Sequence, residues 1–88
     1  MAKKVSAFVF VNVETGSEVD VQKKLATIEG VTEAYKVYGV YDLIAKVTAD
    51  SMDKLKEIIT WRIRKIEKVK LTLTMIMSET LIIMEEKD

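Results

Sequence analysis

The 88-residue chain contains no cysteine, no histidine and no proline, and only three glycines. Without cysteine or histidine it has no disulfide, no thiolate nucleophile, and neither of the side chains that most often bind zinc or act as a general base. We therefore expect no catalytic residues, no metal site and no cofactor. The 14 basic side chains are balanced by 14 acidic ones, so the composition does not favour direct binding to nucleic acid.

Long apolar segments are also absent. Residues 5–13 follow two lysines, as the apolar part of a signal peptide would, but Ser6 and Asn12 interrupt them and no cleavage pattern follows. Residues 71–84 contain five polar side chains, so they cannot form a continuous membrane span of about 20 apolar residues. We expect a cytoplasmic protein that does not contact a membrane.

What is present is the pattern of one small globular domain over residues 1–88, with 49% hydrophobic and 32% charged side chains. Alternating and β-branched apolar residues predict four strands and a short fifth one, at residues 5–13, 31–38, 41–48, 69–77 and 80–86. Helical spacing of apolar residues predicts helices at 18–28 and 51–66. We expect Ser17 to cap the first helix and Asp50 or Ser51 to cap the second, with Gly30 ending the first.

The order β-α-β-β-α-β predicts an α+β, ferredoxin-like fold with an antiparallel sheet and both helices on one face. A two-residue turn, Gly39-Val40, should join the second and third strands, with Gly39 at positive φ. The first strand is apolar on both faces, because Phe8 and Phe10 alternate with valines. An open sheet face of this kind is expected to be buried.

Burial of six to ten apolar side chains at about 1.5 to 3 kcal/mol each would offset an association cost of about 4 to 15 kcal/mol. We therefore predict an isologous homodimer, or a multiple of one, in which two sheets stack. The alternative is that the fifth strand or a crossing loop covers this face within one chain.

Residues 30–47, GVTEAYKVYGVYDLIAKV, resemble the ligand-binding (RAM) domain of Lrp/AsnC regulators, and the resemblance covers nearly the whole chain. Its most specific part is Gly39-x-Tyr41-Asp42-Leu43, at the hairpin where the family has Gly-Asp-Tyr-Asp. The resemblance implies a dimeric α/β barrel, assembly of dimers into tetramers or octamers, and small effectors, typically amino acids, bound between dimers. Val40 stands at the family's first Asp. No helix-turn-helix domain precedes the first strand, so the chain resembles a stand-alone RAM protein.

The candidate ligand site that follows from this resemblance consists of Gly39, Val40, Tyr41, Asp42, Thr72 and Thr74. Backbone amides of the turn would bind a carboxylate, Asp42 would hold an ammonium group, and the threonines would add hydroxyl partners. In the alternative interpretation, Gly39 only makes the turn, Tyr41 packs at the dimer edge and Asp42 bonds the hairpin backbone.

Other conspicuous side chains have simpler interpretations. The basic residues Arg62, Arg64, Lys65, Lys68 and Lys70 are interpreted as exposed cations near a helix C-terminus rather than as a phosphate or nucleic-acid site. Trp61 is interpreted as a half-exposed core residue, with a subunit contact as the alternative. Met75, Met77 and Met84 are interpreted as core and interface residues rather than as a metal site.

Three functional hypotheses of different classes are compatible with these sequence features. The preferred hypothesis is a non-enzymatic effector-binding and oligomerisation module that acts in transcriptional regulation through a related full-length regulator. The alternative is a small dimeric α+β-barrel enzyme acting on an aromatic substrate, against which the lack of histidine and of a polar group directed into an apolar pocket counts. A third possibility is a purely structural dimerisation module.

Overall fold

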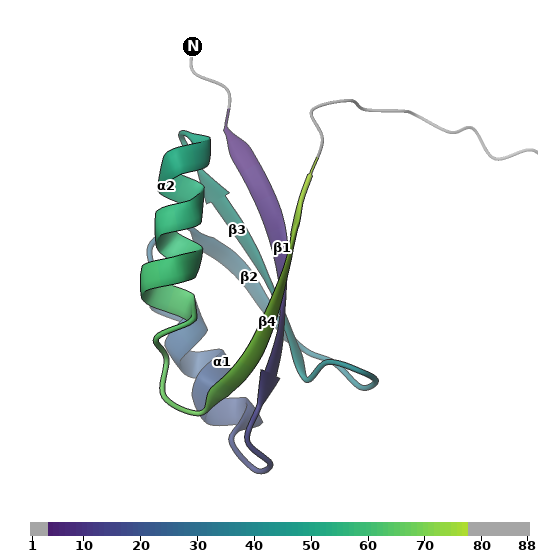
Figure 1. Ribbon diagram of the computed structural model, residues 1–88. Helices are drawn as coiled ribbons and strands as arrows, with labels where there is room; N and C mark the ends of the chain where they lie inside the picture. The colour runs from purple at the N-terminus through teal and green to yellow at the C-terminus, as the bar shows by residue number, and fades with distance from the viewer. Residues whose placement is uncertain (1–3, 78–88) are drawn as a thin grey trace, which may run out of the picture.

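The computed structural model describes residues 4–77 and has the expected α+β architecture. Its elements are β1 (Val5–Val13), α1 (Glu18–Ala26), β2 (Val31–Lys36), β3 (Leu43–Ala49), α2 (Met52–Glu57), the π-helix η1 (Ile58–Ile63) and β4 (Val69–Ile76). The sheet has the order β2-β3-β1-β4, and all neighbouring strands are antiparallel. Figure 1 shows the helices on one face of this sheet. The ferredoxin-like fold is confirmed, whereas the predicted fifth strand and Met84 lie outside the described residues.

The core lies between the sheet and the helices. On β1, every second side chain, from Ala7 to Val13, is buried, and the same alternation buries one face of β3. Leu25 from α1, Leu55 from α2 and Ile63 from η1 are fully buried against these strands. The buried side chains of the strands, which follow a period of two, and those of the helices, which follow helical spacing, therefore form one apolar layer.

The two helix starts differ from one another. Ser51 caps α2 as predicted, because its extended backbone lets its side chain accept a hydrogen bond from the Lys54 N–H at 3.1 Å. Ser17 precedes α1, but its side chain caps nothing, so this part of the prediction is wrong. Its backbone has φ −101° and ψ 5° rather than the extended conformation that aims a side-chain oxygen at the first helical amides.

Both helices end earlier than the sequence predicts. The N–H groups of Thr27 and Ile28 bond to carbonyls three residues back, so the chain tightens and α1 stops at Ala26. The second helix changes to π geometry at Ile58, and the Arg64 N–H bonds to the Ile59 carbonyl five residues back at 3.0 Å. The apolar spacing that predicts this helix also counts Met52 among its inward residues, which is wrong, since this side chain is exposed.

The hairpin between β2 and β3 is also wider than predicted. Val37 N–H bonds to the Asp42 carbonyl at 2.9 Å, so four residues, rather than Gly39-Val40 alone, form its tip. A two-residue type I′ turn needs positive φ at both central residues. Gly39 has φ +147° as predicted, but Val40 is not among the positive-φ residues, because β-branched side chains disfavour that conformation.

Candidate functional site

The hairpin tip carries three of the six predicted ligand residues, Gly39, Val40 and Tyr41, and a fourth, Asp42, closes it. Gly39 and Val40 are exposed at the tip, and the Val40 carbonyl accepts a hydrogen bond from Asn12 Nδ2 at 3.2 Å. The Asn12 Oδ1 atom beside it is buried and has no hydrogen-bond partner among residues 4–77. A donor from a ligand or from a second copy would satisfy this oxygen.

Asp42 and Tyr41 are both held against β1. Asp42 Oδ2 accepts a hydrogen bond from the Val13 N–H at 2.9 Å, and the Asp42 N–H donates to the Val11 carbonyl at 3.0 Å. The Tyr41 ring packs on Phe10 with 5.5 Å between ring centroids. The Asp42 side chain thus bonds the backbone of β1, whereas the alternative interpretation expected a bond to the hairpin backbone, and a role in holding a ligand stays a prediction.

Thr72 and Thr74, the other predicted residues, lie in a groove between β4 and the helix formed by α2 and η1. The groove has a volume of about 540 Å³, within the range of small-molecule sites. Its polar lining consists of Lys56, Thr60, Arg64, Lys70, Thr72 and Thr74. We name this surface the basic groove.

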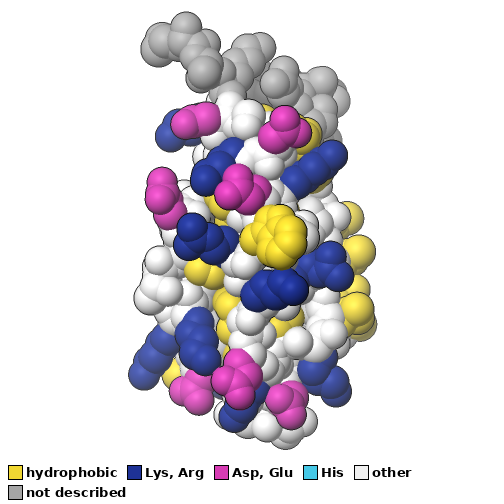
Figure 2. Space-filling view, turned by 60° about the vertical axis from the view of Figure 1, so that its left-hand side comes forward, with side chains coloured by type: hydrophobic (Ala, Val, Ile, Leu, Met, Phe, Trp, Pro, Cys, Tyr) yellow, Lys and Arg dark blue, Asp and Glu magenta, His cyan; other side chains and the backbone are white. Residues whose placement is uncertain are grey.

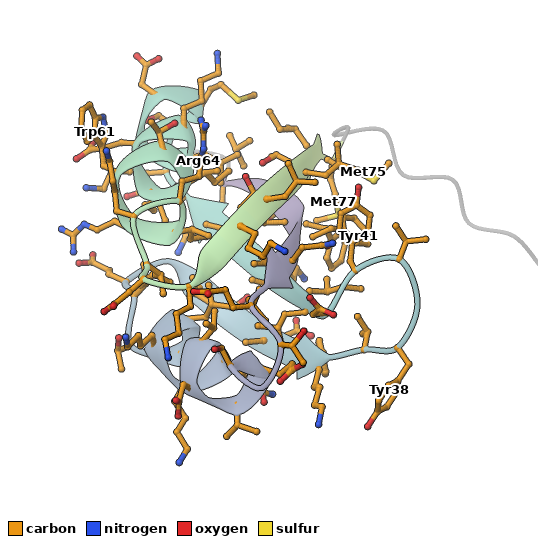
Figure 3. The ribbon with its side chains drawn as sticks, turned by 60° about the horizontal axis from the view of Figure 1, so that its bottom comes forward. Tyr38, Tyr41, Trp61, Arg64, Met75 and Met77 are labelled. Carbon is orange, nitrogen blue, oxygen red and sulfur yellow. The ribbon has the colours of Figure 1, made fainter. Side chains whose placement is uncertain are left out.

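Arg64 lines the basic groove directly after the π-helix. Because the Arg64 N–H bonds to the carbonyl of Ile59, this turn holds an extra residue. Ile58, Ile59 and Ile63 are all buried, and Ile59 also lines the groove with Arg64. Figure 3 shows Arg64 on the side of the helix that faces β4, whereas Trp61 points away from the sheet.

The two parts of the predicted site do not meet in one chain. Asp42 bonds β1 from the β3 side, whereas Thr72 pairs with β1 from the β4 side. In Figure 1 the hairpin tip projects away from the helices. Sequence reasoning also missed Lys56, Thr60 and the groove position of Arg64. One signal could have found them: Lys56, Thr60 and Arg64 are spaced four residues apart, and residues with this spacing lie on the same side of a helix.

The sheet face opposite the helices is apolar, and no helix or strand of residues 4–77 covers it. Phe8 and Phe10 on β1 pair with Met75 and Leu73 on β4, and Ile44 on β3 pairs with Phe10. Met75 and Leu73 are exposed, and the phenylalanines are partly exposed. Figure 3 shows Met75, Met77 and Tyr41 together on this side of the sheet. We name this surface the open face.

Polar side chains on the open face are paired with one another. Lys46 lies 3.7 Å from Glu33, and the hydroxyls of Ser6 and Thr48 are 2.9 Å apart. Tyr35 also donates its hydroxyl hydrogen to Glu33, and this bond, together with the negative charge of Glu33, raises the pKa of Tyr35. Paired polar groups cost less to bury than unpaired ones, so the face is suited to contact another surface.

The helix-covered side carries charges of both signs, as Figure 2 shows. Trp61 is 64% exposed there, with Lys65 Nζ 5.5 Å from the ring centroid, so its interpretation as a core residue is wrong. The five basic residues near the helix end are exposed as expected, but Arg64 and Lys70 line the basic groove.

Two further observations concern residues 4–77. They contain no group of three or more Asp, Glu, His or Cys side chains that could hold a metal ion. No helix in this part of the chain is both long enough and apolar enough to cross a membrane.

Comparisons with known proteins place this geometry in a family. The structure of FFRP-DM1 is 43% identical, with a TM-score of 0.81, over 84% of this chain and 99% of that chain. The hypothetical protein PHS023 from Pyrococcus horikoshii is also 43% identical, with a TM-score of 0.80, over 84% of this chain and 89% of that one. Both relatives consist almost entirely of the matched domain.

A longer relative is the leucine response regulatory protein LrpA of Mycobacterium tuberculosis. It is 27% identical, with a TM-score of 0.73, over 94% of this chain and 56% of that chain. A search of curated proteins found no match. The family model for the Lrp/AsnC ligand-binding domain matches residues 6–86. The chain therefore belongs to the Lrp/AsnC ligand-binding domain family.

Proposed function

We propose that this chain is an effector-binding and assembly module of transcriptional regulation, which binds a small molecule of the amino-acid class between copies of itself. The observation that carries the proposal is the family match over residues 6–86. The family is regulatory rather than enzymatic. The name of the relative LrpA refers to a response to leucine, which supports an amino acid as the effector.

The open face supports self-association. Phe10, Leu73 and Met75 would lose their contact with water if a second sheet packed on them, and each fully buried apolar side chain contributes about 1.5 to 3 kcal/mol. The ion pair between Lys46 and Glu33 would enter the interface with its charges already compensated. We propose a homodimer through this face, with dimers assembling further into tetramers or octamers.

The separation of the hairpin tip from the basic groove supports a ligand site shared between copies. Gly39, Val40, Tyr41 and Asp42 lie on one side of β1, and Thr72 and Thr74 on the other. A hairpin tip from a second copy would bring the two sets together. An effector held there shifts the balance of assembly states only by its differential affinity for them.

We further propose that the module acts in the cytoplasm through a related full-length regulator, by mixed assembly through the open face. In this arrangement the regulator contacts DNA and the module does not. The balanced charge of the chain agrees with this division, because direct DNA binding usually needs a basic excess.

The first test is thermal unfolding with each of the twenty amino acids. A ligand at about 100 times its Kd adds about 2.7 kcal/mol, which raises the midpoint by roughly 10 °C in a domain of this size. Sedimentation velocity with the stabilising amino acid should then show a changed distribution of oligomers. If no amino acid stabilises the protein, the effector part of the proposal is wrong and a purely structural module is favoured.

Self-association is tested separately with Leu73→Lys, which places a charge on the open face beside Phe10. The control is Val19→Lys, an exposed apolar residue of α1. We expect Leu73→Lys to shift the protein to monomers and Val19→Lys to leave the assembly intact. A monomeric wild-type protein at micromolar concentration would contradict the dimer.

A further inference from the structure

The charge of the basic groove is one-sided. Lys56 and Arg64 contribute from the helix, and Lys70 contributes from β4, and among residues 4–77 no carboxylate lines the groove. The whole chain carries equal numbers of basic and acidic residues, so this local excess does not reflect the composition. Within residues 4–77, the ion pairs are Lys46–Glu33 and Lys54–Glu57, and neither includes a groove cation.

Three like charges in one groove repel each other, and an anionic ligand relieves this repulsion. Lys56 and Arg64 line the helix side of the groove, and Lys70 lies on β4 with the threonines, so a ligand in the groove has basic groups of both the helix and β4 around it. Arg64 offers a planar fork of N–H donors that matches a carboxylate, and the hydroxyls of Thr72 and Thr74 can donate to its remaining lone pairs. The groove is thus equipped for oxygen anions.

A zwitterionic amino acid with a neutral side chain fits this charge poorly. Its carboxylate is attracted by the cations, but its ammonium group is repelled by them and leaves the local excess unchanged. A second carboxylate gives the ligand a net negative charge and engages a second cation. The volume of about 540 Å³ is large enough for a ligand of amino-acid size.

We propose that the basic groove selects a four- or five-carbon dicarboxylate, so that the effector belongs to the class of the acidic amino acids or of their 2-oxo acids. This inference rests on the proposed function, because it names the effector class of the same module. Acidic amino acids and their 2-oxo acids share the pair of carboxylates, and they differ because only the amino acids carry an ammonium group.

The experiment is calorimetric titration of the full chain with glutamate and, separately, with glutamine, which has nearly the same shape and lacks one charge. Aspartate and asparagine form a second matched pair, and 2-oxoglutarate tests the need for the ammonium group. We expect glutamate or aspartate to bind at least tenfold more tightly than its amide. The affinity should fall as sodium chloride is raised from low to high concentration, because added salt screens the charges.

The test variant is Arg64→Gln, and the matched control is Arg62→Gln, an exposed arginine of the same helix that does not line the basic groove. We expect Arg64→Gln to weaken dicarboxylate binding at least tenfold, with less effect on any binding of the amides, and Arg62→Gln to change it less than twofold. Circular dichroism and unfolding midpoints of both variants show whether the fold is retained.

The possible results separate this inference from the proposed function. If a neutral amino acid binds as tightly as glutamate, the dicarboxylate selectivity is wrong and the effector function stands. If 2-oxoglutarate binds but no amino acid does, the selectivity stands and the amino-acid effector is wrong. If none of these compounds binds, the dicarboxylate selectivity is wrong, and the unfolding test with all twenty amino acids decides the effector function separately. Equal losses in Arg64→Gln and Arg62→Gln would remove the basic groove as the site.

Discussion

Gly30 offers a sharp test of the packing between the start of β2 and the second helix. It has φ +98°, and a Cβ atom added to it would lie 2.7 Å from Ile58 Cδ1 and 3.2 Å from the Thr48 carbonyl oxygen. The Gly30 carbonyl also accepts a hydrogen bond from the Thr48 N–H at 2.8 Å, so the backbone cannot move away freely. Gly30→Ala therefore combines backbone strain with a steric clash.

The two contributions can be separated with Gly16. This residue has φ +88°, and nothing lies within 4 Å of a Cβ atom added to it. A non-glycine residue in this conformation costs about 1 to 3 kcal/mol, and forcing an extra carbon into a packed site costs about 1 to 3 kcal/mol more. We expect Gly16→Ala to lower the free energy of unfolding by the first amount, and Gly30→Ala by the sum, about 2 to 6 kcal/mol.

The assay is urea unfolding of each variant at one fixed protein concentration, since self-association contributes to apparent stability. Ile58→Val removes the Cδ1 atom at a cost of about 0.5 to 1.5 kcal/mol, and Gly30→Ala should cost less in that background than in the wild type. Equal losses for Gly16→Ala and Gly30→Ala, with no coupling to Ile58, would refute the close contact.

Two smaller predictions concern single hydrogen bonds. Ser51→Ala removes the cap of α2 and should lower the free energy of unfolding by about 0.5 to 2 kcal/mol, measured by urea unfolding, whereas Ser17→Ala removes no capping bond and should cost less. The raised pKa of Tyr35 predicts that one tyrosine ionises above the usual 10.0 in an absorbance titration, and that Glu33→Gln abolishes this. Because the folded-state pKa is raised, the stabilisation by this bond is present below pH 10.0 and is lost as the pH rises through the raised pKa. An unchanged titration in Glu33→Gln would contradict the assigned cause.

Much of the fold follows from local patterns. Alternating apolar residues in β1 and β3 identified both strands within a residue or two, because a strand with a buried face has a strict period of two. The cap at Ser51 and the positive φ of Gly39 were also predictable, since each depends on one residue type and its immediate neighbours.

The predictions failed for features that depend on contacts between residues far apart in the sequence. The end of the second helix depends on how Ile58, Ile59 and Ile63 pack against the sheet, and the π-turn that lets all three be buried has no simple local signature. Trp61 is exposed as a consequence of that packing, although an aromatic residue beside an apolar stripe is more often half-buried.

The candidate site also has one part that the sequence determined and another that only the tertiary structure decided. The sequence by itself determined the hairpin motif, with Gly39, Tyr41 and Asp42, because these residues are neighbours in the chain. It also determined that β1 is apolar on both faces, and hence that a second apolar face is present once the helices are packed on the first. Only the tertiary structure decided that Lys56 and Arg64 of the helix face Lys70, Thr72 and Thr74 of β4 across one groove. Residues this far apart in sequence become neighbours only through the strand order β2-β3-β1-β4 and the packing of the helix on the sheet, because nothing in the local sequence of either segment specifies the other.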